Sequence, residues 1–325
     1  MKKCIVTGGA GFIGSNIARR LIESGYQVFI LDDLSTGFER NIPAGAEFIR
    51  LDVSDPKACA CADLPETIDV VYHIAAQPSG EASFEDPTRD CDVNYKATYN
   101  MLELSRRKCA GRFLFASSMS VYGEVNEDNF VVSEKDPPRP SSYYGCHKLS
   151  SENIIRIAGA NSGLDTTCFR LFNVYGYNQN MHNMKQGMVS IYMSYLLNNQ
   201  PVHVKGSLDR FRDFIFVDDV VEAFIKSEKE PATFGGVYNL GTGIKTTVEE
   251  LLQSMLKVYG KDDFAKWVYS EGFTAGDIKG CVADINAIKK VLDWQPRYTV
   301  TRGIQEMKVW VDETIDLWRA EVIKS

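Results

Sequence analysis

Short apolar runs alternate with stretches of helical spacing over the first half of the chain, and most runs end at a glycine or a polar residue. The first runs are residues 3–7 and 27–31, and the segment from Ser15 to Ser24 between them has the spacing of an amphipathic helix. Further elements are predicted as strands at 47–51, 69–74, 112–116 and 166–171 and a helix at 94–107. This order predicts an α/β fold with a doubly wound parallel sheet.

The pattern loosens beyond residue 173. Residues 212–220 start extended and then predict a helix capped by an aspartate. Thr246, with Glu249 three residues later, predicts another helix start with a capping box. The segment 126–142 is polar and contains several prolines, so it is predicted as a loop.

A glycine-rich turn, residues 7–14, joins the first strand to the first helix. Gly8 allows a sharp turn, Gly11 lets the backbone approach a pyrophosphate, and Gly14 lets the helix pack on the strand. The free N–H groups and the dipole of the helix N-terminus favour phosphate there. Asp32, at the end of the second strand, can accept hydrogen bonds from a ribose diol, and its charge would repel a 2′-phosphate. The pattern therefore predicts an NAD site; the alternative is a glycine turn that arose by chance.

This signature predicts a Rossmann-type NAD-binding domain over residues 1–173, with 212–243 partly returning to it. Residues 174–325 are expected to form mainly a smaller α+β lobe that binds substrate. Ligands of such sheets bind at the carboxyl ends of the strands. The residues that follow predicted strand ends, and that we expect at this edge, are Asp32, Asp52, Ala75, Ser118 and Asn173.

Tyr144 and Lys148 lie four residues apart, so on a helix they share one face. An ammonium group that close favours the phenolate, which would lower the tyrosine pKa from about 10 toward neutral. Such a tyrosine can take a proton from an alcohol and return it. The alternative is an ordinary surface helix, because a Tyr and a Lys at this spacing often occur by chance.

Composition narrows the function classes. The chain has 325 residues, a net charge of -7 and 24% charged residues, which argues against nucleic-acid or anionic-membrane binding. No apolar run approaches the roughly 18 residues of a membrane span, and the N-terminus leaves no room for a signal peptide, so a cytoplasmic protein is expected. The eight cysteines are scattered and are interpreted as reduced thiols. Cys59 and Cys61 have no partners at zinc-site spacing, so no metal is expected.

Eight motifs in order resemble an extended short-chain dehydrogenase/reductase of the NAD-dependent nucleotide-sugar epimerase/dehydratase group, nearest the UDP-glucose 4-epimerase type. The resemblance covers nearly the whole chain. Its motifs are residues 7–14, 31–37, 73–77, 117–123, 144–148, 170–176, 211–214 and 238–243.

The resemblance implies a cofactor role for a large set of residues. The pyrophosphate, the adenosine and the nicotinamide of NAD would each contact part of it. The set is Gly8, Gly11, Phe12, Ile13, Gly14, Asp32, Asp33, Leu34, Ser35, Thr36, Gly37, Asp52, Val53, Ala75, Ala76, Gln77, Asn94, Tyr144, Lys148 and Phe172. For Asn94 the alternative is an amide that only anchors its helix.

The resemblance also implies a catalytic triplet of Ser118, Tyr144 and Lys148, of which Ser118 and Tyr144 contact the sugar. Asn173 and Arg212 would bind the diphosphate of a nucleotide sugar. A local cation there is reasonable independently, because an acidic protein that binds a diphosphate needs one. The alternative for Arg212 is an ion pair with Asp213 or Asp209.

Met119 and Ser120 follow the catalytic serine, where related 4,6-dehydratases and decarboxylases carry acidic residues. Elimination needs an extra acid and base, so dehydration and decarboxylation are disfavoured. We expect a nucleotide-sugar 4-epimerase that oxidises C4 transiently and returns the hydride to either face. A C4 dehydrogenase or 4-ketoreductase is the alternative, and a catalytically silent NAD-binding regulator is a more distant one.

One position departs from the family pattern. Thr274 stands where the familiar epimerases have an arginine that binds the diphosphate, and Asp277 matches as a nucleotide contact or, alternatively, a loop cap. UDP is the favoured nucleotide, with GDP or another left open, and the sugar is left open. The resemblance further implies a homodimer.

Overall fold

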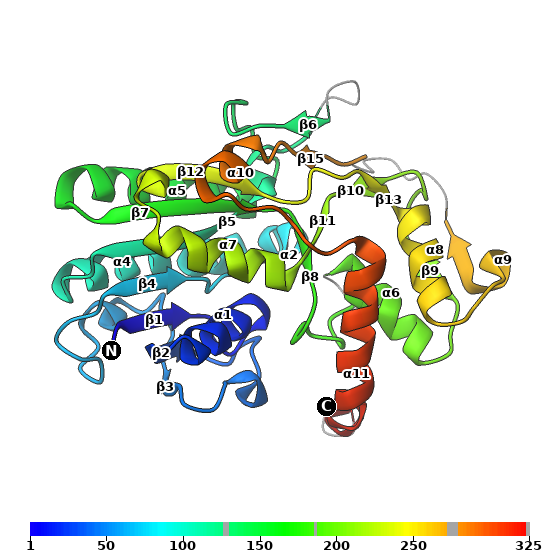
Figure 1. Cartoon of the computed structure of the whole chain (residues 1–325), viewed down its shortest axis with the longest axis horizontal. Coiled ribbons are helices and arrows are strands. Elements are labelled where there is room, and N and C mark those ends of the chain that lie inside the picture. The colour runs from blue at the N-terminus through cyan, green and yellow to red at the C-terminus, as the bar shows by residue number, and fades with distance from the viewer. Residues whose placement is uncertain (126–129, 185–186, 272–278, 323–325) are drawn as a thin grey trace.

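The protein is described here by a computed structural model that covers residues 1–125, 130–184, 187–271 and 279–322. A seven-stranded parallel sheet forms the larger part of the molecule (Figure 1), in the order β12-β7-β5-β4-β1-β2-β3. Its strands are β1 (Lys3–Thr7), β2 (Gln27–Asp32), β3 (Glu47–Arg50), β4 (Val70–His73), β5 (Arg112–Ser118), β7 (Asp165–Leu171) and β12 (Gly236–Leu240). The predicted doubly wound α/β class of Rossmann type is confirmed.

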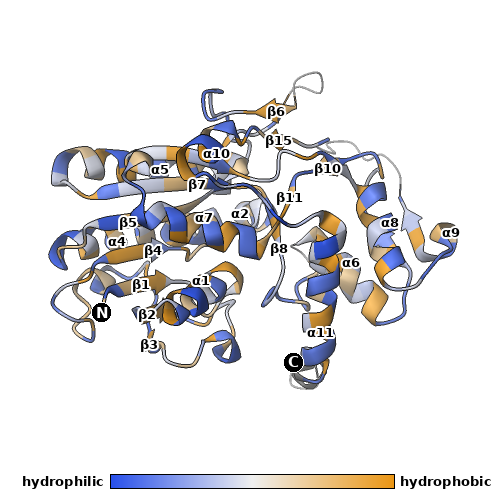
Figure 2. Ribbon diagram, in the orientation of Figure 1, coloured by the Kyte–Doolittle hydropathy of each residue, from blue (hydrophilic) through white to orange (hydrophobic). Residues whose placement is uncertain are grey.

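Helices cover both faces of this sheet. On one face α1 (Phe12–Glu23) packs beside α7 (Val217–Lys229), and on the other α4 (Ala97–Arg107) packs beside α5 (Tyr143–Ser162). Figure 2 shows largely hydrophobic strands between helices that carry hydrophilic stripes on their outer sides. Each fully buried Leu, Ile or Phe in these layers contributes about 1.5–3 kcal/mol to the stability of the fold. The carboxyl edge of the sheet is therefore held in place by a well-packed core.

The remaining elements surround this core, and most of those near the C-terminal end of the chain lie at one side of Figure 1. Four two-stranded pairings, β11 with β8, β15 with β6, β14 with β9 and β10 with β13, connect them. The elements are α2 (Gly80–Glu85), α3 (Pro87–Cys91), β6 (Val131–Val132), β8 (Asn173–Tyr175), α6 (Met188–Leu197), β9 (Val202–Val204), β10 (Phe211–Arg212), β11 (Phe214–Phe216), β13 (Thr246–Thr247), α8 (Val248–Val258), α9 (Phe264–Trp267), β14 (Val268–Ser270), β15 (Val282–Ala283), α10 (Asn286–Leu292) and α11 (Val300–Val322). Short helical turns η1 to η5 comprise Glu39–Asn41, Pro56–Ala60, Asp92–Lys96, Met119–Val121 and Pro231–Thr233.

Three local predictions are wrong. The segment predicted as a loop at 126–142 contains β6, which pairs with β15 and whose Val132 carbonyl accepts a hydrogen bond from Asn239 Nδ2 at 2.8 Å. Helix α7 starts after Phe216 without a side-chain cap, because the buried carboxylate of Asp219 instead accepts from the backbone N–H groups of Arg297 and Tyr298.

The third error concerns the start of α8. Its capping box is formed by Thr247 and Glu250, one residue later than predicted. The Glu250 N–H donates to Thr247 Oγ1 at 3.1 Å, and Glu250 Oε2 accepts from the Thr247 N–H at 2.7 Å. Thr246 is not available as a cap because it pairs with Arg212 in the β10–β13 ladder.

Two negative findings apply to the described part of the chain. None of its helices is long and apolar enough to cross a membrane. Within the same residues, no three His, Cys, Asp or Glu side chains gather in a way that could hold a metal ion.

Candidate active site at the carboxyl edge of the sheet

The turn between β1 and α1 is crowded, and Gly8 within it and Gly14 just after it have no room for a side chain. A Cβ atom on Gly8, whose φ is 67°, would lie 2.9 Å from the Ala75 backbone, and one on Gly14 would collide with the Gly8 carbonyl oxygen. Gly11 caps α1 with its backbone only, and the first turn of α1 carries no acidic residue. Bare N–H groups at the positive end of a helix are suited to a phosphate, so this cradle fits the pyrophosphate of a dinucleotide.

Asp32 ends β2 beside this turn and is 8% exposed. Its Oδ2 accepts from the Ala10 N–H at 3.0 Å, and its Oδ1 accepts from the Leu34 N–H at 2.8 Å. Burial raises the pKa of this carboxyl, while the two N–H donors lower it. Besides the predicted ribose role, Asp32 therefore ties the glycine turn to the loop 33–37. Just after this loop, the Phe38 N–H donates to the Ala10 carbonyl of the same turn at 3.0 Å.

The residues after β3 and β4 line the same edge. Asp52 is exposed and accepts from the Ser54 N–H at 2.8 Å, whereas Val53 is buried and its carbonyl accepts from Asn100 Nδ2 at 3.0 Å. Ala75 and Ala76 are half-buried, and the Ala75 N–H donates to Thr7 Oγ1 at 3.0 Å. The ends of β1 and β4 are thus fixed relative to each other.

Gln77 and Asn94 continue this wall. Gln77 Nε2 donates to Asp90 Oδ1, and Asn94 Nδ2 donates both to the Gln77 carbonyl at 2.9 Å and to Asp90 Oδ1 at 2.8 Å. Asn94 lies in the π-helical turn Asp92–Lys96 and does the anchoring that the alternative prediction assigns to it. Its buried Oδ1 has no hydrogen-bond partner among the described residues, so a cofactor contact stays a prediction.

Ser118, Tyr144 and Lys148 come together as predicted, all three buried. Ser118 ends β5, and its Oγ accepts from the Ser120 N–H at 3.1 Å. Tyr144 lies in the first turn of α5, where Ser142 Oγ accepts from the Gly145 N–H at 3.1 Å. Gly145 has no room for a Cβ because the Ser120 carbonyl lies against it. That close approach brings α5 onto the end of β5 and the phenol toward Ser118.

The predicted fall in the Tyr144 pKa is wrong for this structure. Burial raises the pKa of Tyr144 to about 12, against the opposing effect of a hydrogen bond with Ser118. Lys148 Nζ lies 5.9 Å from the Tyr144 ring centre and donates to the Ala116 carbonyl at 3.0 Å. Burial lowers the Lys148 pKa to about 8. The loss of water from the phenol therefore outweighs an ammonium group that faces another acceptor.

A buried ion pair behind the triplet was missed by the sequence analysis. Glu152, one helical turn after Lys148, accepts from Ser117 Oγ at 2.5 Å and from Arg170 Nη2 at 2.8 Å. Arg170 Nη1 also donates to the Tyr122 hydroxyl at 3.0 Å. This pair fixes α5 to β5 and β7, and the only sequence signal for it is a glutamate four residues after the lysine.

The predicted substrate residues lie on the C-terminal side of the edge. Asn173 begins β8, and its buried Oδ1 has no partner among the described residues. Arg212 is half-buried in β10, with Nη1 donating to the carbonyls of Phe211 at 2.7 Å and Lys279 at 3.1 Å. The buried carboxylate of Asp213 accepts instead from Thr242, Gly243 and Ala283.

The remaining predicted positions complete the comparison. Phe172, assigned to the nicotinamide, is buried between β7 and β8, and its N–H donates to the Leu240 carbonyl at 3.0 Å. Asp277 and the departing Thr274 lie outside the described residues. Asp209, an alternative partner for Arg212, lies with its Oδ2 4.0 Å from Lys279 Nζ.

A parallel sheet with a glycine-rich turn, an acid at the end of β2 and a buried Ser–Tyr–Lys set defines an NAD-dependent short-chain dehydrogenase/reductase of the extended type. The chain matches the model of the NAD dependent epimerase/dehydratase family over residues 4–241. The chain therefore belongs to that family.

Relatives and solved structures agree with this assignment. The chain is 33% identical to the UDP-glucose 4-epimerase of Mycolicibacterium smegmatis, over 93% of this chain and 96% of that protein. It resembles the UDP-glucose 4-epimerase of Thermotoga maritima solved with UDP-glucose, with a TM-score of 0.90, 31% identity and coverage of 96% and 99%. The Thermus thermophilus UDP-glucose 4-epimerase in complex with NAD matches with a TM-score of 0.85, 33% identity and coverage of 95% and 99%.

Proposed function

We propose that this protein is an NAD-dependent nucleotide-sugar 4-epimerase. The observation that carries the proposal is the gathering of Ser118, Tyr144 and Lys148 in a buried cluster at the sheet edge that also holds the glycine turn. Similarity to UDP-glucose 4-epimerases over almost the full length supports the same activity. Family membership makes NAD the cofactor.

Specific residues are proposed to hold NAD. The glycine turn would take the pyrophosphate, Asp32 and the loop 33–37 the adenosine ribose, and Asp52 and Val53 the adenine. Residues 75–77 and Asn94 would form the wall, and Tyr144, Lys148 and Phe172 would border the nicotinamide end. NAD⁺, when bound, supplies a hydride acceptor and a positive charge at this edge.

Residues of the chain itself bind the reacting oxygen of the sugar and transfer its proton. Tyr144 Oη takes the proton of the C4 hydroxyl and later returns it to the same oxygen, while Ser118 Oγ donates a hydrogen bond to that oxygen. A phenol whose pKa is about 12 is protonated at neutral pH, so the oxidation requires additional positive charge beside it. Since all three groups are buried, water is kept from the keto sugar while it turns over.

The nucleotide sugar is proposed to be held by the C-terminal part of the chain, residues 174–325, together with Asn173. Arg212 is a cation two residues before Phe214, and Phe214 of β11 pairs with Asn173 of β8. Asn173 Oδ1 is buried and has no hydrogen-bond partner among the described residues. UDP is the favoured nucleotide because the solved relatives bind UDP-glucose or are named for it. A homodimer is also proposed, supported by Tyr99 and Ile157, which are exposed apolar side chains on α4 and α5.

The testing experiment is to incubate the protein with a panel of UDP-, GDP-, CDP- and dTDP-sugars and to resolve the products by NMR. An epimerase interconverts a pair of C4 epimers without a net change in reduced-nicotinamide absorbance. Stoichiometric consumption of NADH would instead identify the dehydrogenase or 4-ketoreductase alternative. Binding of NAD without any turnover would leave only a regulatory protein.

A further inference from the structure

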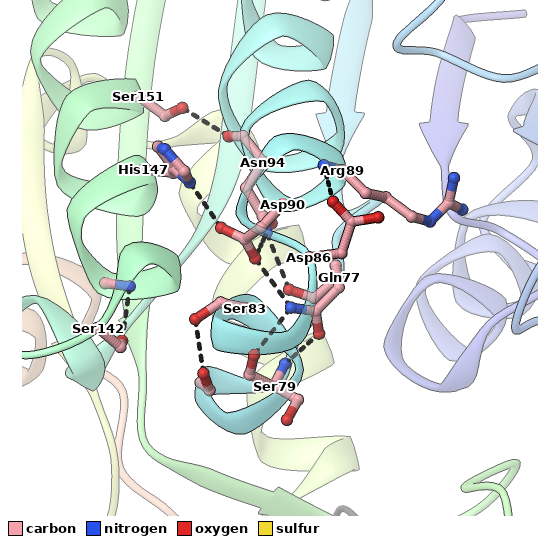
Figure 3. Close-up of polar contacts among 12 residues, drawn as sticks. Gln77, Ser79, Ser83, Asp86, Arg89, Asp90, Asn94, Ser142, His147 and Ser151 are labelled. Atoms are coloured by element: carbon pink, nitrogen blue, oxygen red, sulfur yellow. Dashed lines mark hydrogen bonds and ion pairs between the residues drawn. The ribbon is translucent and has the colours of Figure 1, made fainter.

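A buried carboxylate lies directly behind the catalytic helix and has no role in the chemistry described above. Asp90, at the end of α3, is fully buried, with a relative exposure of 0%. It accepts hydrogen bonds from Gln77 Nε2 at 2.8 Å and Asn94 Nδ2 at 2.8 Å, and its Oδ2 lies 2.6 Å from His147 Nδ1 (Figure 3). A buried charge is retained only where several donors hold it.

His147 stands between the tyrosine and the lysine of the triplet. Its side chain is 17% exposed and closes over Asp90 from α5. One turn further along α5, Ser151 Oγ donates to the Asn94 carbonyl at 2.8 Å. The same short stretch of α5 is therefore tied twice to the wall that Gln77 and Asn94 form.

The charge of Asp90 also reaches the reacting groups. It raises the pKa of Tyr144, though less than burial does, and it opposes the effect of burial on Lys148. Besides burial and Asp90, the hydrogen bond with Ser118 of β5 acts on the pKa of Tyr144 and lowers it. Lys148, on the same helix as Tyr144, lies with its Nζ 5.9 Å from the ring centre.

Lys148 has several further neighbours. Glu152 on α5 and Cys168 on β7 raise its pKa, in the same direction as Asp90. His73 on β4 is fully buried, and burial together with Lys148 lowers its pKa to about 3. His73 is therefore neutral at physiological pH and adds no charge beside Lys148.

We propose that Asp90 and His147 are a positioning pair, in which the buried carboxylate, anchored by Gln77 and Asn94, holds the reactive turn of α5 against the cofactor wall. The pair acts through Tyr144 and Lys148 and does not itself contact substrate. This proposal rests on the proposed function, since the turn it positions is the one that carries the base. Its consequence is that loosening the pair lowers the chemical rate more than it weakens substrate binding.

The first test compares two substitutions at one position. The side-chain amide of asparagine places Nδ2 where the imidazole has Nδ1, so His147→Asn keeps a donor to Asp90 that His147→Ala lacks. We expect His147→Ala to lower kcat by about 10- to 100-fold, as misplacement of a reacting group does, with KM for the nucleotide sugar changed far less. His147→Asn should recover most of the loss.

The second test removes the charge. In Asp90→Asn, the pKa that governs the basic form of Tyr144 should fall, because Asp90 raises it. The matched control is Asp92→Asn, two residues along the chain from Asp90. Asp92 is a half-exposed carboxylate that pairs with Lys96 at 3.4 Å, so the control removes a charge that is not buried. The control should leave the pH profile of kcat unchanged.

A readout without turnover separates the two proposals. Tyrosine ionisation is followed by difference absorbance, with Tyr144→Phe as the reference that removes the signal of Tyr144. If the wild-type protein epimerises no sugar, the proposed function is contradicted. A shift of the Tyr144 titration in Asp90→Asn would still support the positioning pair in that case. If kcat of His147→Ala equals that of wild type, or the Tyr144 titration is the same in Asp90→Asn, the positioning pair is overturned. Should Asp90→Asn fail to fold, the two His147 variants decide the question.

Discussion

The two sides of the site are built differently. On the sheet side, Asp32, Gln77 and Lys148 are held by hydrogen bonds to other parts of the same chain. On the C-terminal side, Arg212 is half-buried and reaches backbone carbonyls of β10 and of residue 279. Asp32 and Lys148 are buried, whereas Arg212 is only half-buried. Under the proposed function, the catalytic groups are therefore fixed in the core and the substrate is bound outside it. Substitutions on the first side should act on kcat or stability, and those on the second on substrate affinity.

Tyr144→Phe should have the largest effect. It removes the proton acceptor while keeping the buried ring, so activity should fall by about 10²- to 10⁴-fold, the usual contribution of a general base. The amount of NAD that copurifies should be unchanged. Steady-state assays together with cofactor release measure both quantities, and substantial remaining turnover would remove Tyr144 from its role.

Breaking the ion pair behind the triplet should cost stability. Arg170→Met leaves Glu152 buried without its partner, and loss of one member of such a pair costs about 3–5 kcal/mol. Urea unfolding of the two proteins gives the difference. A surface pair, Arg106 with Glu103, is the matched control, and Arg106→Met should cost far less, because water screens an exposed ion pair. Equal costs for both variants would contradict the account of the buried pair.

The pH dependence of stability should reveal the buried lysine. Folding lowers the pKa of Lys148 from its ordinary 10.5 to about 8. Below pH 8 the group is charged in both states and its burial cost is present in full; as pH rises toward 10.5 the folded chain releases the proton and the cost disappears. Relative to Lys148→Met, wild type should therefore gain up to about 3 kcal/mol over this range. Urea unfolding at both ends of the range measures it, and a difference that stays constant with pH would contradict it.

Arg212→Ala should act on the other side of the site. Loss of one charge-assisted hydrogen bond to a diphosphate costs about 1.5–3 kcal/mol, so KM and Kd for the nucleotide sugar should rise by roughly 10- to 100-fold while kcat changes little. Calorimetric titration with the nucleotide sugar tests this. An unchanged Kd would show that the diphosphate is bound elsewhere.

The smallest effect is expected at α8. Thr247→Ala removes the cap that accepts from the Glu250 N–H, which costs about 0.5–2 kcal/mol of stability. Thr247→Ser is the matched control, because serine keeps a hydroxyl that can accept from the Glu250 N–H. Thermal unfolding should show the larger loss for Thr247→Ala, and equal losses for the two variants would contradict the assignment of the cap.

These comparisons also show what the sequence could and could not provide. The glycine turn and the doubly wound parallel sheet follow from local spacing, and the meeting of Ser118 with Tyr144 was implied by the family resemblance. The direction in which the Tyr144 pKa shifts could not be predicted from the sequence, because it depends on burial and on Lys148 facing the Ala116 carbonyl. The sequence prediction placed the cap of α8 one residue too early, because it could not show that Thr246 pairs with Arg212 in the β10–β13 ladder.

Long-range polar contacts were the least predictable. Asp90 and His147 are 57 positions apart, and nothing in their local patterns joins them. The only available signal was a histidine inserted between the tyrosine and the lysine of the motif. Asp277 and Thr274, which bear on the nucleotide, lie outside the described residues, so their roles stay predictions.

The most direct test uses a nucleotide sugar that carries deuterium on C4, followed by NMR and mass spectrometry of the product. Oxidation and return of the hydride within a closed site predicts that the C4 epimer forms and keeps the deuterium. Exchange of the label with solvent, or turnover that never inverts C4, would contradict the account.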